Sequence, residues 1–374
     1  MSPRILVVGQ LPPPVHGSNV MTERCMDALR ANGFDAMLVE KPFSRTLEEV
    51  GKISPRKAAQ VPPLCRKLLN AAVDARPGLC LYFISVGLPA LLVDSLLIAL
   101  LRQRGIPYVL YFHGRGYRDY QAARYRPVAG IVRRTLAGAL GGLVLGEGLK
   151  SDVGHHIPEE RLYVLPNGIP DIRPEVCRPR NGAAVTVGFL GNLIPSKGPM
   201  TFLEMAKRVV EKDKGVRFAM AGRHVSEAYL RDLRGFVARE GLAGFVELSG
   251  PRYGTAKDRF FQEADIFVFP TAFRKETFAL VNVEAMQWGL PVISSPVGAI
   301  PEVVRDGETG FIVDPADIDL LACRVLKLAG DPELRGRMGR AARQRYEDCF
   351  SLEAYGRNLK QAMDRFIRLN AASG

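Results

Sequence analysis

The 374-residue sequence lacks the short motifs of several common site classes. It contains neither the GxGxxG fingerprint of dinucleotide-binding folds nor the GxxxxGK loop of P-loop proteins, so neither class of site is indicated. Its six cysteines show neither a paired metal spacing nor a CxxC, which predicts reduced thiols in a cytosolic protein. No stretch of about 20 residues is uninterruptedly apolar, so we expect no membrane-spanning helix. The apolar run at residues 5–9 is too short for a signal peptide and predicts a first strand.

Carboxylates with a metal-binding pattern are also scarce. One Asp-x-Asp occurs, at Asp317 and Asp319, and it opens a predicted helix after Pro315. Helix capping and the favourable placement of an acid in the first helical turn explain this pair better than metal binding does. We therefore expect neither a required metal nor a bound cofactor.

Acidic residues are few in the first half of the chain. The net charge of +12 is uneven, because residues 1–182 contain 24 Lys and Arg against 15 Asp and Glu, an excess of +9. Such asymmetry indicates an anionic partner, either nucleic acid or an anionic membrane face. Residues 114–136 combine arginines with tyrosines, which suits an anionic lipid interface, although nucleic acid or a solvated basic face would also accept them. These residues are Arg115, Tyr117, Arg118, Tyr120, Arg124, Tyr125, Arg126, Arg133 and Arg134.

What is present is a series of apolar runs alternating with helical patterns, which predicts an α/β protein with parallel sheets. The length suffices for two domains, and a hydrophobic content of 47% with 24% charged residues is that of a globular chain. Prolines and charges cluster at residues 170–184, where we place the boundary. We expect buried strands at residues 5–9, 79–84, 108–112, 143–146, 163–165, 185–191, 217–222, 246–250 and 266–269.

The stretch from residue 266 to 304 organises the second half. Its strand ends at Pro270, where a loop begins, and a mostly apolar helix is predicted over 277–286. In open α/β sheets ligands bind at the carboxyl ends of the strands, and a helix amino terminus there favours an anion. Glu276 and Glu284 would lie roughly 12 Å apart along such a helix and be rotated by about 80°, so they can grip both ends of a nucleotide diphosphate-sugar. Alternatively, Glu276 complements the helix dipole and Glu284 is solvated.

The order of residues in this stretch resembles the donor-site signature of family 4 retaining glycosyltransferases. Glu276 and Glu284 are followed by Ala-Met, by Gly-Leu-Pro-Val-Ile at 289–293 and by Gly-Ala-Ile-Pro-Glu at 298–302. The resemblance implies that Glu276 binds sugar hydroxyls and that Glu284 binds the ribose. Backbone amides would touch the sugar and the diphosphate. These amides belong to the segment made of Thr277, Phe278, Ala279 and Leu280, which departs from the family pattern of small residues at Thr277 and Ala279.

The resemblance also implies the GT-B fold, with two Rossmann-like, doubly wound domains that face a central cleft. Residues 1–180 would bind the acceptor and residues 181–350 the nucleotide-sugar donor. A last helix, within residues 351–374, would return to the first domain.

In the first domain, the loop after the first strand resembles the family's glycine loop, which approaches the donor phosphate and the acceptor. Gly17 matches it, whereas His16 stands where a second glycine is common. A turn that caps a helix is the alternative. His113 follows the strand at 108–112 and so points at the crevice. A lone histidine is more often structural, but family members place one here, beside the reacting bond, where it binds the donor sugar.

In the second domain, the loop after residue 191 corresponds to one in which the family carries an arginine and a lysine that clamp the diphosphate. Lys197 matches the lysine, but Asn192 replaces the arginine. Arg252, or Arg274 with Lys275, are candidate substitutes. The resemblance further places the nucleobase beside Arg252.

These features predict a metal-independent, retaining hexosyltransferase. It would move a sugar from a UDP- or GDP-sugar to a glycan or lipid-linked acceptor in bacterial surface polysaccharide or glycolipid synthesis. We expect it in the cytoplasm, peripheral to the inner face of the plasma membrane. The alternative is a non-catalytic nucleotide-sugar-binding or membrane-scaffold protein that kept the fold after losing the arginine at position 192. A nucleic-acid partner has support from charge alone, and we do not predict one.

Overall fold

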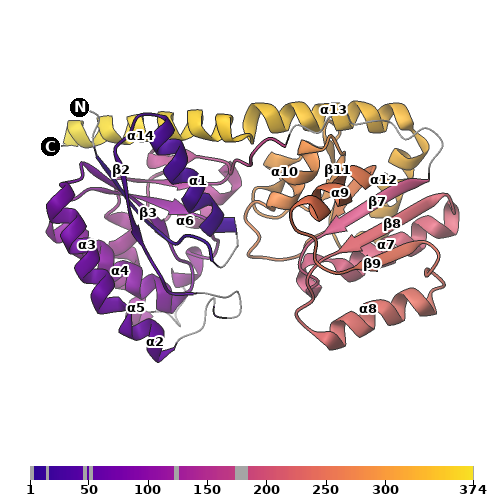
Figure 1. Cartoon of the computed structure of the whole chain (residues 1–374), viewed down its shortest axis with the longest axis horizontal. Helices are drawn as coiled ribbons and strands as arrows, with labels where there is room; N and C mark the ends of the chain where they lie inside the picture. The colour runs from indigo at the N-terminus through magenta and orange to yellow at the C-terminus, as the bar shows by residue number, and fades with distance from the viewer. Residues whose placement is uncertain are drawn as a thin grey trace. The chain divides into compact units, whose positions relative to one another are not determined.

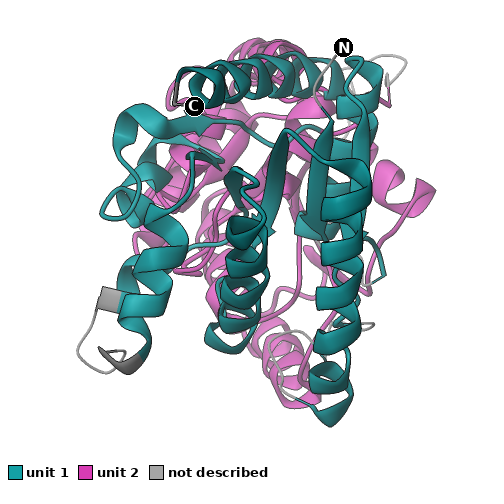
Figure 2. Ribbon diagram, turned by 90° about the vertical axis from the view of Figure 1, so that its left-hand side faces the viewer, with its two compact units in different colours: residues 1–168, 352–374 teal, residues 169–351 magenta. Residues whose placement is uncertain are grey.

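The computed structural model describes residues 4–13, 17–44, 49, 54–121, 126–172 and 184–373. The chain forms two compact units: unit 1 contains residues 1–168 and 352–374, and unit 2 contains residues 169–351 (Figure 2). The division after Gly168 comes earlier than the predicted boundary at residue 180. Most of the predicted linker, residues 173–183, lies outside the described residues.

Unit 1 is built on six parallel strands in the order β2-β1-β3-β4-β5-β6. The strands are β1 (Ile5–Gly9), β2 (Ala36–Glu40), β3 (Leu79–Ile84), β4 (Tyr108–Phe112), β5 (Gly141–Val144) and β6 (Leu162–Val164). Every residue of β1, β3 and β4 is buried. Parallel strands covered on both faces have continuous apolar sequences, so the predicted bounds of these three strands are confirmed.

The helices of unit 1 come from both ends of the chain. They are α1 (Gly17–Ala31), α2 (Pro55–Ala59), α3 (Val61–Ala75), α4 (Leu88–Gln103), α5 (Arg126–Ala137), α6 (Lys150–Val153) and α14 (Leu352–Ser373). Helix α4 begins at Leu88, because Gly87 is its N-cap and Pro89 occupies its first turn, where proline is favoured.

The last helix, α14, packs against α1 within unit 1 (Figure 1). Its side chains Tyr355, Leu359 and Phe366 are buried, and Asn32 of α1 donates a hydrogen bond to the carbonyl of Gly356 at 3.2 Å. The predicted return of the final helix to the first domain is confirmed.

Unit 2 has six parallel strands in the order β12-β11-β10-β7-β8-β9. The strands are β7 (Val185–Leu190), β8 (Val216–Ala221), β9 (Val246–Ser249), β10 (Ile266–Phe269), β11 (Val292–Ser294) and β12 (Gly310–Ile312). The helices are α7 (Pro199–Lys212), α8 (Glu227–Arg239), α9 (Thr255–Glu263), α10 (Leu280–Gln287), α11 (Ile300–Val303), α12 (Ile318–Gly330) and α13 (Pro332–Cys349). Asp317 caps α12 by accepting a hydrogen bond from the amide of Leu320 at 2.9 Å, as predicted.

In each sheet, the strands that follow the first one along the chain are added on one side of it and then, after a single reversal, on its other side. In unit 1 the reversal lies between β1 and β3, and in unit 2 it lies between β7 and β10. Such a reversal opens a crevice at the carboxyl ends of the two strands, where doubly wound folds bind ligands. The topology therefore points to the loops after β1 and β3 in unit 1, and to the loops after β7 and β10 in unit 2.

Among the described helices, none combines the length and the apolar character needed to cross a membrane. The cysteines in the described part of the chain, Cys25, Cys65, Cys80, Cys323 and Cys349, are free thiols.

Candidate functional site

The loop after β10 and the helix α10 that follows it carry most of the predicted donor residues of unit 2. The predicted helix over 277–286 begins too early, because α10 starts at Leu280. Its N-cap, Ala279, has φ 52° and ψ 71°, a left-handed conformation that non-glycine residues seldom adopt. Glu276 therefore lies in the loop, and the helical spacing expected between Glu276 and Glu284 is wrong.

Neighbouring backbone holds this loop in place. The amide of Glu276 donates to the carbonyl of Phe273 at 2.7 Å, and the amide of Ala299 donates to the carbonyl of Thr277 at the same distance. Gly298 has φ 59°, and a Cβ there would lie 2.5 Å from the Glu276 carbonyl oxygen and 2.6 Å from that of Thr277. Only glycine fits such an approach without displacing the loop. The glycine of the 298–302 motif thus supports the loop that carries Glu276.

Two predicted catalytic residues meet at the reversal of the unit 2 sheet. Lys197, in the 3₁₀ turn Pro195–Lys197 after β7, places its Nζ 3.3 Å from Oε2 of Glu276. The side chains are 23% and 13% exposed, so an approaching ligand can reach them. The two loops also touch through their backbones, since the amide of Ala272 donates to the carbonyl of Ser196 at 2.8 Å. Gly198 permits this approach, because a Cβ there would lie 2.1 Å from the carbonyl oxygen of Pro270.

Glu284 lies in α10 and is also half-buried rather than solvated. Its Oε1 is 2.8 Å from Nζ of Lys257, a residue in the first turns of α9. Sequence reasoning missed Lys257, because no local motif marks it. The signal that could have indicated it is its position shortly after Arg252, in the helix that follows the predicted base-binding loop.

The candidate diphosphate site lacks a basic side chain at the position where the family carries its arginine. Asn192 is exposed just after β7. Arg252 is 38% exposed, and its guanidinium lies 3.7 Å from the Glu247 carboxylate. Arg274 and Lys275 are exposed in the turn that immediately precedes Glu276. All three candidate substitutes for the missing arginine therefore reach solvent.

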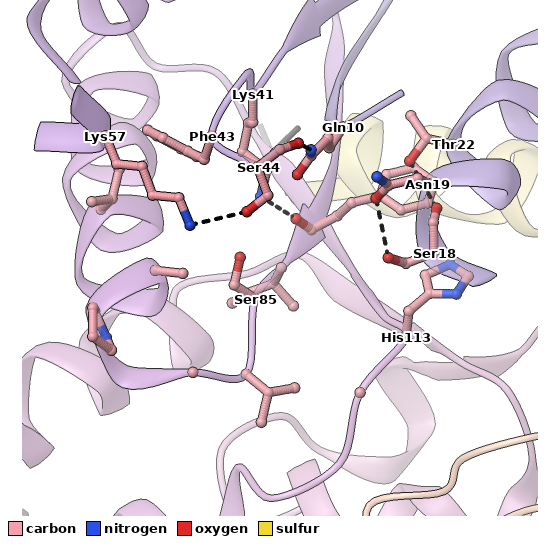
Figure 3. Close-up of a pocket in the computed structure, with 18 of the residues that line it drawn as sticks. Gln10, Ser18, Asn19, Thr22, Lys41, Phe43, Ser44, Lys57, Ser85 and His113 are labelled. Carbon is pink, nitrogen blue, oxygen red and sulfur yellow. Dashed lines mark hydrogen bonds between the residues drawn. The ribbon is translucent and has the colours of Figure 1, made fainter. Parts of the chain in front are cut away.

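In unit 1, His113 follows β4 and lines a cavity of about 660 Å³ (Figure 3). Its ring stacks on Phe83 with a centroid distance of 5.2 Å and an interplanar angle of 8°, and it lies 4.1 Å from the ring of Tyr111. The cavity spans the carboxyl ends of β1 to β4 at the reversal of this sheet. Gly17 is the first residue of α1, whereas His16 lies outside the described residues.

A buried ionic network fixes the strand ends beside the cavity. The Asp94 carboxylate accepts hydrogen bonds from Nζ of Lys41 at 3.0 Å, from the hydroxyl of Tyr82 at 2.7 Å and from the amide of Ser85 at 2.7 Å. Burial, together with the charge of Asp94, raises the pKa of Tyr82 well above its usual range, so this phenol remains a donor. The charges of Lys41 and Asp94 offset each other, as buried ions require.

The segment at residues 114–136 differs in part from expectation. Tyr117 and Tyr120 are buried, and their hydroxyls donate to the carbonyls of Ile84 and Val86. The interpretation of these two tyrosines as interfacial rings is therefore wrong, because they anchor the segment to the end of β3. Arg133 and Arg134 of α5 are exposed, whereas Arg124 and Tyr125 lie outside the described residues.

Among the described residues, no group of three or more His, Cys, Asp or Glu is arranged to hold a metal ion.

Comparison with known proteins finds similarity to glycosyltransferases, mostly in the second half of the chain. Residues 178–345 match the family model described as glycosyl transferases group 1. The chain is 28% identical over 184 residues to the capsular polysaccharide biosynthesis glycosyltransferase CapM of Staphylococcus aureus. The aligned residues make up 49% of this chain and 46% of CapM. The match thus spans less than half the length of that relative.

Solved structures resemble nearly the whole chain. A sucrose-phosphate synthase from Thermosynechococcus elongatus matches with a TM-score of 0.74 at 18% identity, over 98% of this chain and 99% of its own. HepE of Anabaena, solved in complex with UDP and glucose, matches with a TM-score of 0.71 at 16% identity, over 97% of this chain and all of its own. At these identities the likeness concerns the fold, and it confirms the predicted GT-B class.

Proposed function

From the match of residues 178–345 to the model of the group 1 glycosyl transferases, we propose that the chain is a retaining glycosyltransferase that uses a UDP- or GDP-sugar. The observation that carries the proposal is the contact between Lys197 and Glu276 at the reversal of the unit 2 sheet. A cation for a diphosphate and a carboxylate for sugar hydroxyls meet where a doubly wound sheet binds its ligand.

In the proposed donor site, Glu276 accepts hydrogen bonds from the sugar, and Lys197 holds the diphosphate as a point charge. The backbone amides of Phe278, Ala279 and Leu280, at the start of α10, supply further donors for the anion. Glu284 binds the ribose hydroxyls and is oriented by Lys257. The complex of HepE with UDP and glucose supports a uridine nucleotide as the first donor to test.

The proposed reaction breaks the bond between the anomeric carbon and the diphosphate oxygen. A new bond forms from the acceptor oxygen to the same face of that carbon, and the acceptor proton passes to the departing diphosphate. Lys197 and the amides stabilise the charge that develops on the leaving group. The chain's own groups suffice for this role, and no enzyme nucleophile or metal is part of the proposal.

Unit 1 is the proposed acceptor half. His113, at the end of β4, is held by stacking on Phe83 and faces the cavity, which suits a group that contacts the reacting sugar. The similarity to CapM supports a bacterial surface glycan as the product. The exposed arginines of α5 support a lipid-linked acceptor at the inner face of the plasma membrane, with the enzyme held peripherally.

Slow hydrolysis of the donor tests the activity without knowledge of the acceptor. The protein is incubated with a panel of UDP- and GDP-sugars, and released nucleotide and thermal shift are recorded. We expect one donor to be hydrolysed by the parent and not by Glu276→Ala, with equal melting of both proteins without ligand. A thermal shift without hydrolysis, and without transfer to any acceptor tried, would instead support the non-catalytic binding protein that the exposed Asn192 suggests.

A further inference from the structure

Position 192, which lacks the expected arginine, lies beside the loop that follows β8. Strands β7 and β8 are parallel, and their last paired residues are Leu190 and Ala221. The pairing continues past the strand ends in the same register, because an isolated bridge joins Leu193 to His224, each three residues further along. Position 192 therefore stands opposite Arg223, a basic residue that the sequence motifs did not mark.

Backbone contacts hold the two loops together over this stretch. The amide of Gly191 donates to the carbonyl of Ala221 at 3.1 Å, and the amide of Leu193 donates to the carbonyl of Arg223 at 2.8 Å. A Cβ on Gly222 would lie 1.7 Å from the carbonyl oxygen of Gly191, so only glycine allows this approach. The backbone at Arg223 thus lies one strand spacing, about 4.8 Å, from that at position 192.

The loop after β8 is also held where it enters α8. Ser226 caps this helix by accepting a hydrogen bond from the amide of Tyr229 at 3.3 Å. Nε2 of His224 lies 2.6 Å from Oε1 of Glu227 in the first turn of the helix. The half-buried Arg223 therefore extends from a backbone that is positioned on both sides, by the strand extension and by the helix start.

The side chain of Arg223 suits the task expected of an arginine at position 192. In a parallel ladder the side chains of paired residues lie on the same face of the sheet, so Arg223 and Asn192 leave their backbones on one face. A guanidinium has five N–H donors in a planar fork. A contact within the protein therefore leaves donors of Arg223 for the oxygens of a phosphate, which such a fork can bind in pairs.

Arg223 and Lys197 lie on opposite sides of the loop after β7. Ser196 of this loop accepts a hydrogen bond from the loop after β10, whereas Leu193 donates to the loop after β8. The sheet order β10-β7-β8 places these two neighbours on different sides of β7. Lys197, which contacts Glu276, is therefore on the β10 side, and Arg223 is on the β8 side. Two cations so arranged match the two phosphate groups of a diphosphate.

The three exposed candidates for the missing charge are less well placed. Arg252 follows β9, which lies one strand farther from β7, and its guanidinium is 3.7 Å from a carboxylate. Arg274 and Lys275 belong to the loop after β10, on the side where Lys197 already lies. Arg223 differs from all three, because its own carbonyl is bonded to the loop that contains position 192.

We propose that Arg223 replaces the arginine missing at position 192 and binds the diphosphate of the donor together with Lys197. The inference rests on the proposed function and adds one residue to its donor site. Arg223 binds one phosphate group and stabilises the charge that develops on it as the bond to the anomeric carbon breaks. An asparagine at position 192 is then compatible with catalysis, because the positive charge comes from the neighbouring strand.

The test is calorimetric titration of the full chain with UDP, GDP, uridine and guanosine, in which competition with the diphosphate gives the weak nucleoside affinities. Arg223→Ala should bind the diphosphate about tenfold to a hundredfold more weakly, the range for a hydrogen bond to a charged group, and should bind the nucleoside like the parent. Arg223→Gln keeps most of the side chain and replaces Arg223→Ala if that variant melts early. Unchanged diphosphate affinity, or an equal loss for diphosphate and nucleoside, would overturn the assignment.

An arginine restored at position 192 gives a signal that a packing role of Arg223 would not give. Asn192→Arg should return most of the diphosphate affinity to Arg223→Ala and should add little to the parent, so the two changes are coupled. A gain of the same size in both backgrounds would overturn the replacement. Arg231→Ala removes an exposed arginine from α8 and is the control, which should bind every ligand like the parent.

Donor hydrolysis measured in parallel separates this inference from the proposed function. A parent that binds a diphosphate and hydrolyses its sugar donor, with Arg223→Ala unchanged in both respects, refutes the role of Arg223 alone. A parent that binds neither diphosphate and hydrolyses no donor refutes the proposed function. Diphosphate binding that depends on Arg223, without hydrolysis of any donor, supports the site in a non-catalytic binding protein.

Discussion

Nζ of Lys197 lies 3.3 Å from the carboxylate of Glu276, and each residue restrains the other before any donor is present. The pair comes from the two loops that flank the reversal of the unit 2 sheet. The two side chains are mostly buried, so the cost of removing both charges from water offsets much of their attraction and the pair contributes little to stability. In the proposed donor site its role is orientation, because the pair holds both side chains where a sugar diphosphate would take over as their partner.

We predict that Lys197→Ala lowers kcat/KM for transfer, with a loss on the order of 2 kcal/mol or more in transition-state stabilisation. The reason is that Asn192 offers no cation, so Lys197 is the matched charge for the leaving diphosphate. Lys212→Ala removes an exposed lysine from the end of α7 and serves as the control. Activity of Lys197→Ala within about twofold of the parent would show that the diphosphate is held elsewhere.

Glu284→Ala should mainly weaken nucleotide binding, because its carboxylate is the proposed partner of the ribose and Lys257 holds it in place at 2.8 Å. Calorimetry with UDP measures the effect apart from turnover. Glu263→Ala, which removes an exposed acid from the end of α9, is the matched control. Equal affinities of the parent and Glu284→Ala would rule out the ribose assignment.

For His113→Ala we predict a loss in turnover larger than any loss in donor affinity, since the histidine is proposed to contact the reacting sugar rather than the nucleotide. Steady-state kinetics and UDP titration give the two quantities separately. His113→Phe keeps the stacking on Phe83 at 5.2 Å and removes the ring nitrogens. If His113→Phe turns over like the parent, packing alone explains the residue.

The basic surface of unit 1 should bind anionic vesicles, and the binding should weaken as salt is added. Each basic residue near such a surface contributes about 1 kcal/mol, an effect that fades over a Debye length. A variant with Arg124, Arg126, Arg133 and Arg134 neutralised should sediment less with vesicles of graded anionic lipid content.

The control for this surface neutralises basic residues of unit 2 instead. Arg231, Arg234 and Arg239 are exposed on α8, so their loss changes the net charge without changing the first unit. If both variants sediment equally with the vesicles, net charge governs the binding, and not the particular arginines neutralised in unit 1. A parent that ignores anionic vesicles at low salt would make a soluble acceptor the better proposal.

High pH should destabilise unit 2 through Tyr346. Its hydroxyl donates to the carbonyl of Ile169 at 3.2 Å and accepts from Gln287 at 3.1 Å. Burial, followed by the nearby Asp171, raises the pKa of Tyr346 to about 12. An unfolded tyrosine ionises near pH 10, so the folded state retains the proton longer and stability falls as the pH rises from about 10 to 12. Denaturant melts of the parent should show this fall, and Tyr346→Phe should show a shallower one.

Sequence patterns predicted what depends on local chemistry. β3, β4 and β10 are continuous apolar runs because both faces of each strand are buried, and Asp317 caps α12 through a bond three residues away. The start of α10 escaped prediction, because the loop that precedes the left-handed Ala279 is held through Glu276 and Thr277 by the distant segment around Gly298. No sequence pattern specifies such an approach of two backbone segments.

The residues of the candidate site were predictable from local motifs, whereas their contacts across the fold were not. Glu276 and Lys197 were each recognisable in their motifs, but their 3.3 Å contact follows from sheet order. Lys257, the partner of Glu284, comes from another helix, so the sequence around Glu284 could not predict this ion pair. Tyr117 and Tyr120 share a stretch with arginines and were assigned to a surface, although their hydroxyls bond to backbone carbonyls near the end of β3.

The position of α14 at the end of the chain affects how the protein emerges from the ribosome. Residues 1–168 are synthesised before residues 169–351, yet the α1 surface that packs on α14 near Tyr355 and Gly356 is covered only when that 22-residue helix has been made. At roughly 5–20 residues per second, synthesis of residues 169–351 takes on the order of 10–40 s. During that interval the nascent first unit exposes an apolar helix face, which makes it a client for chaperones. A chain truncated at Ser351 would keep that face open permanently, even though every residue of the proposed donor site is present.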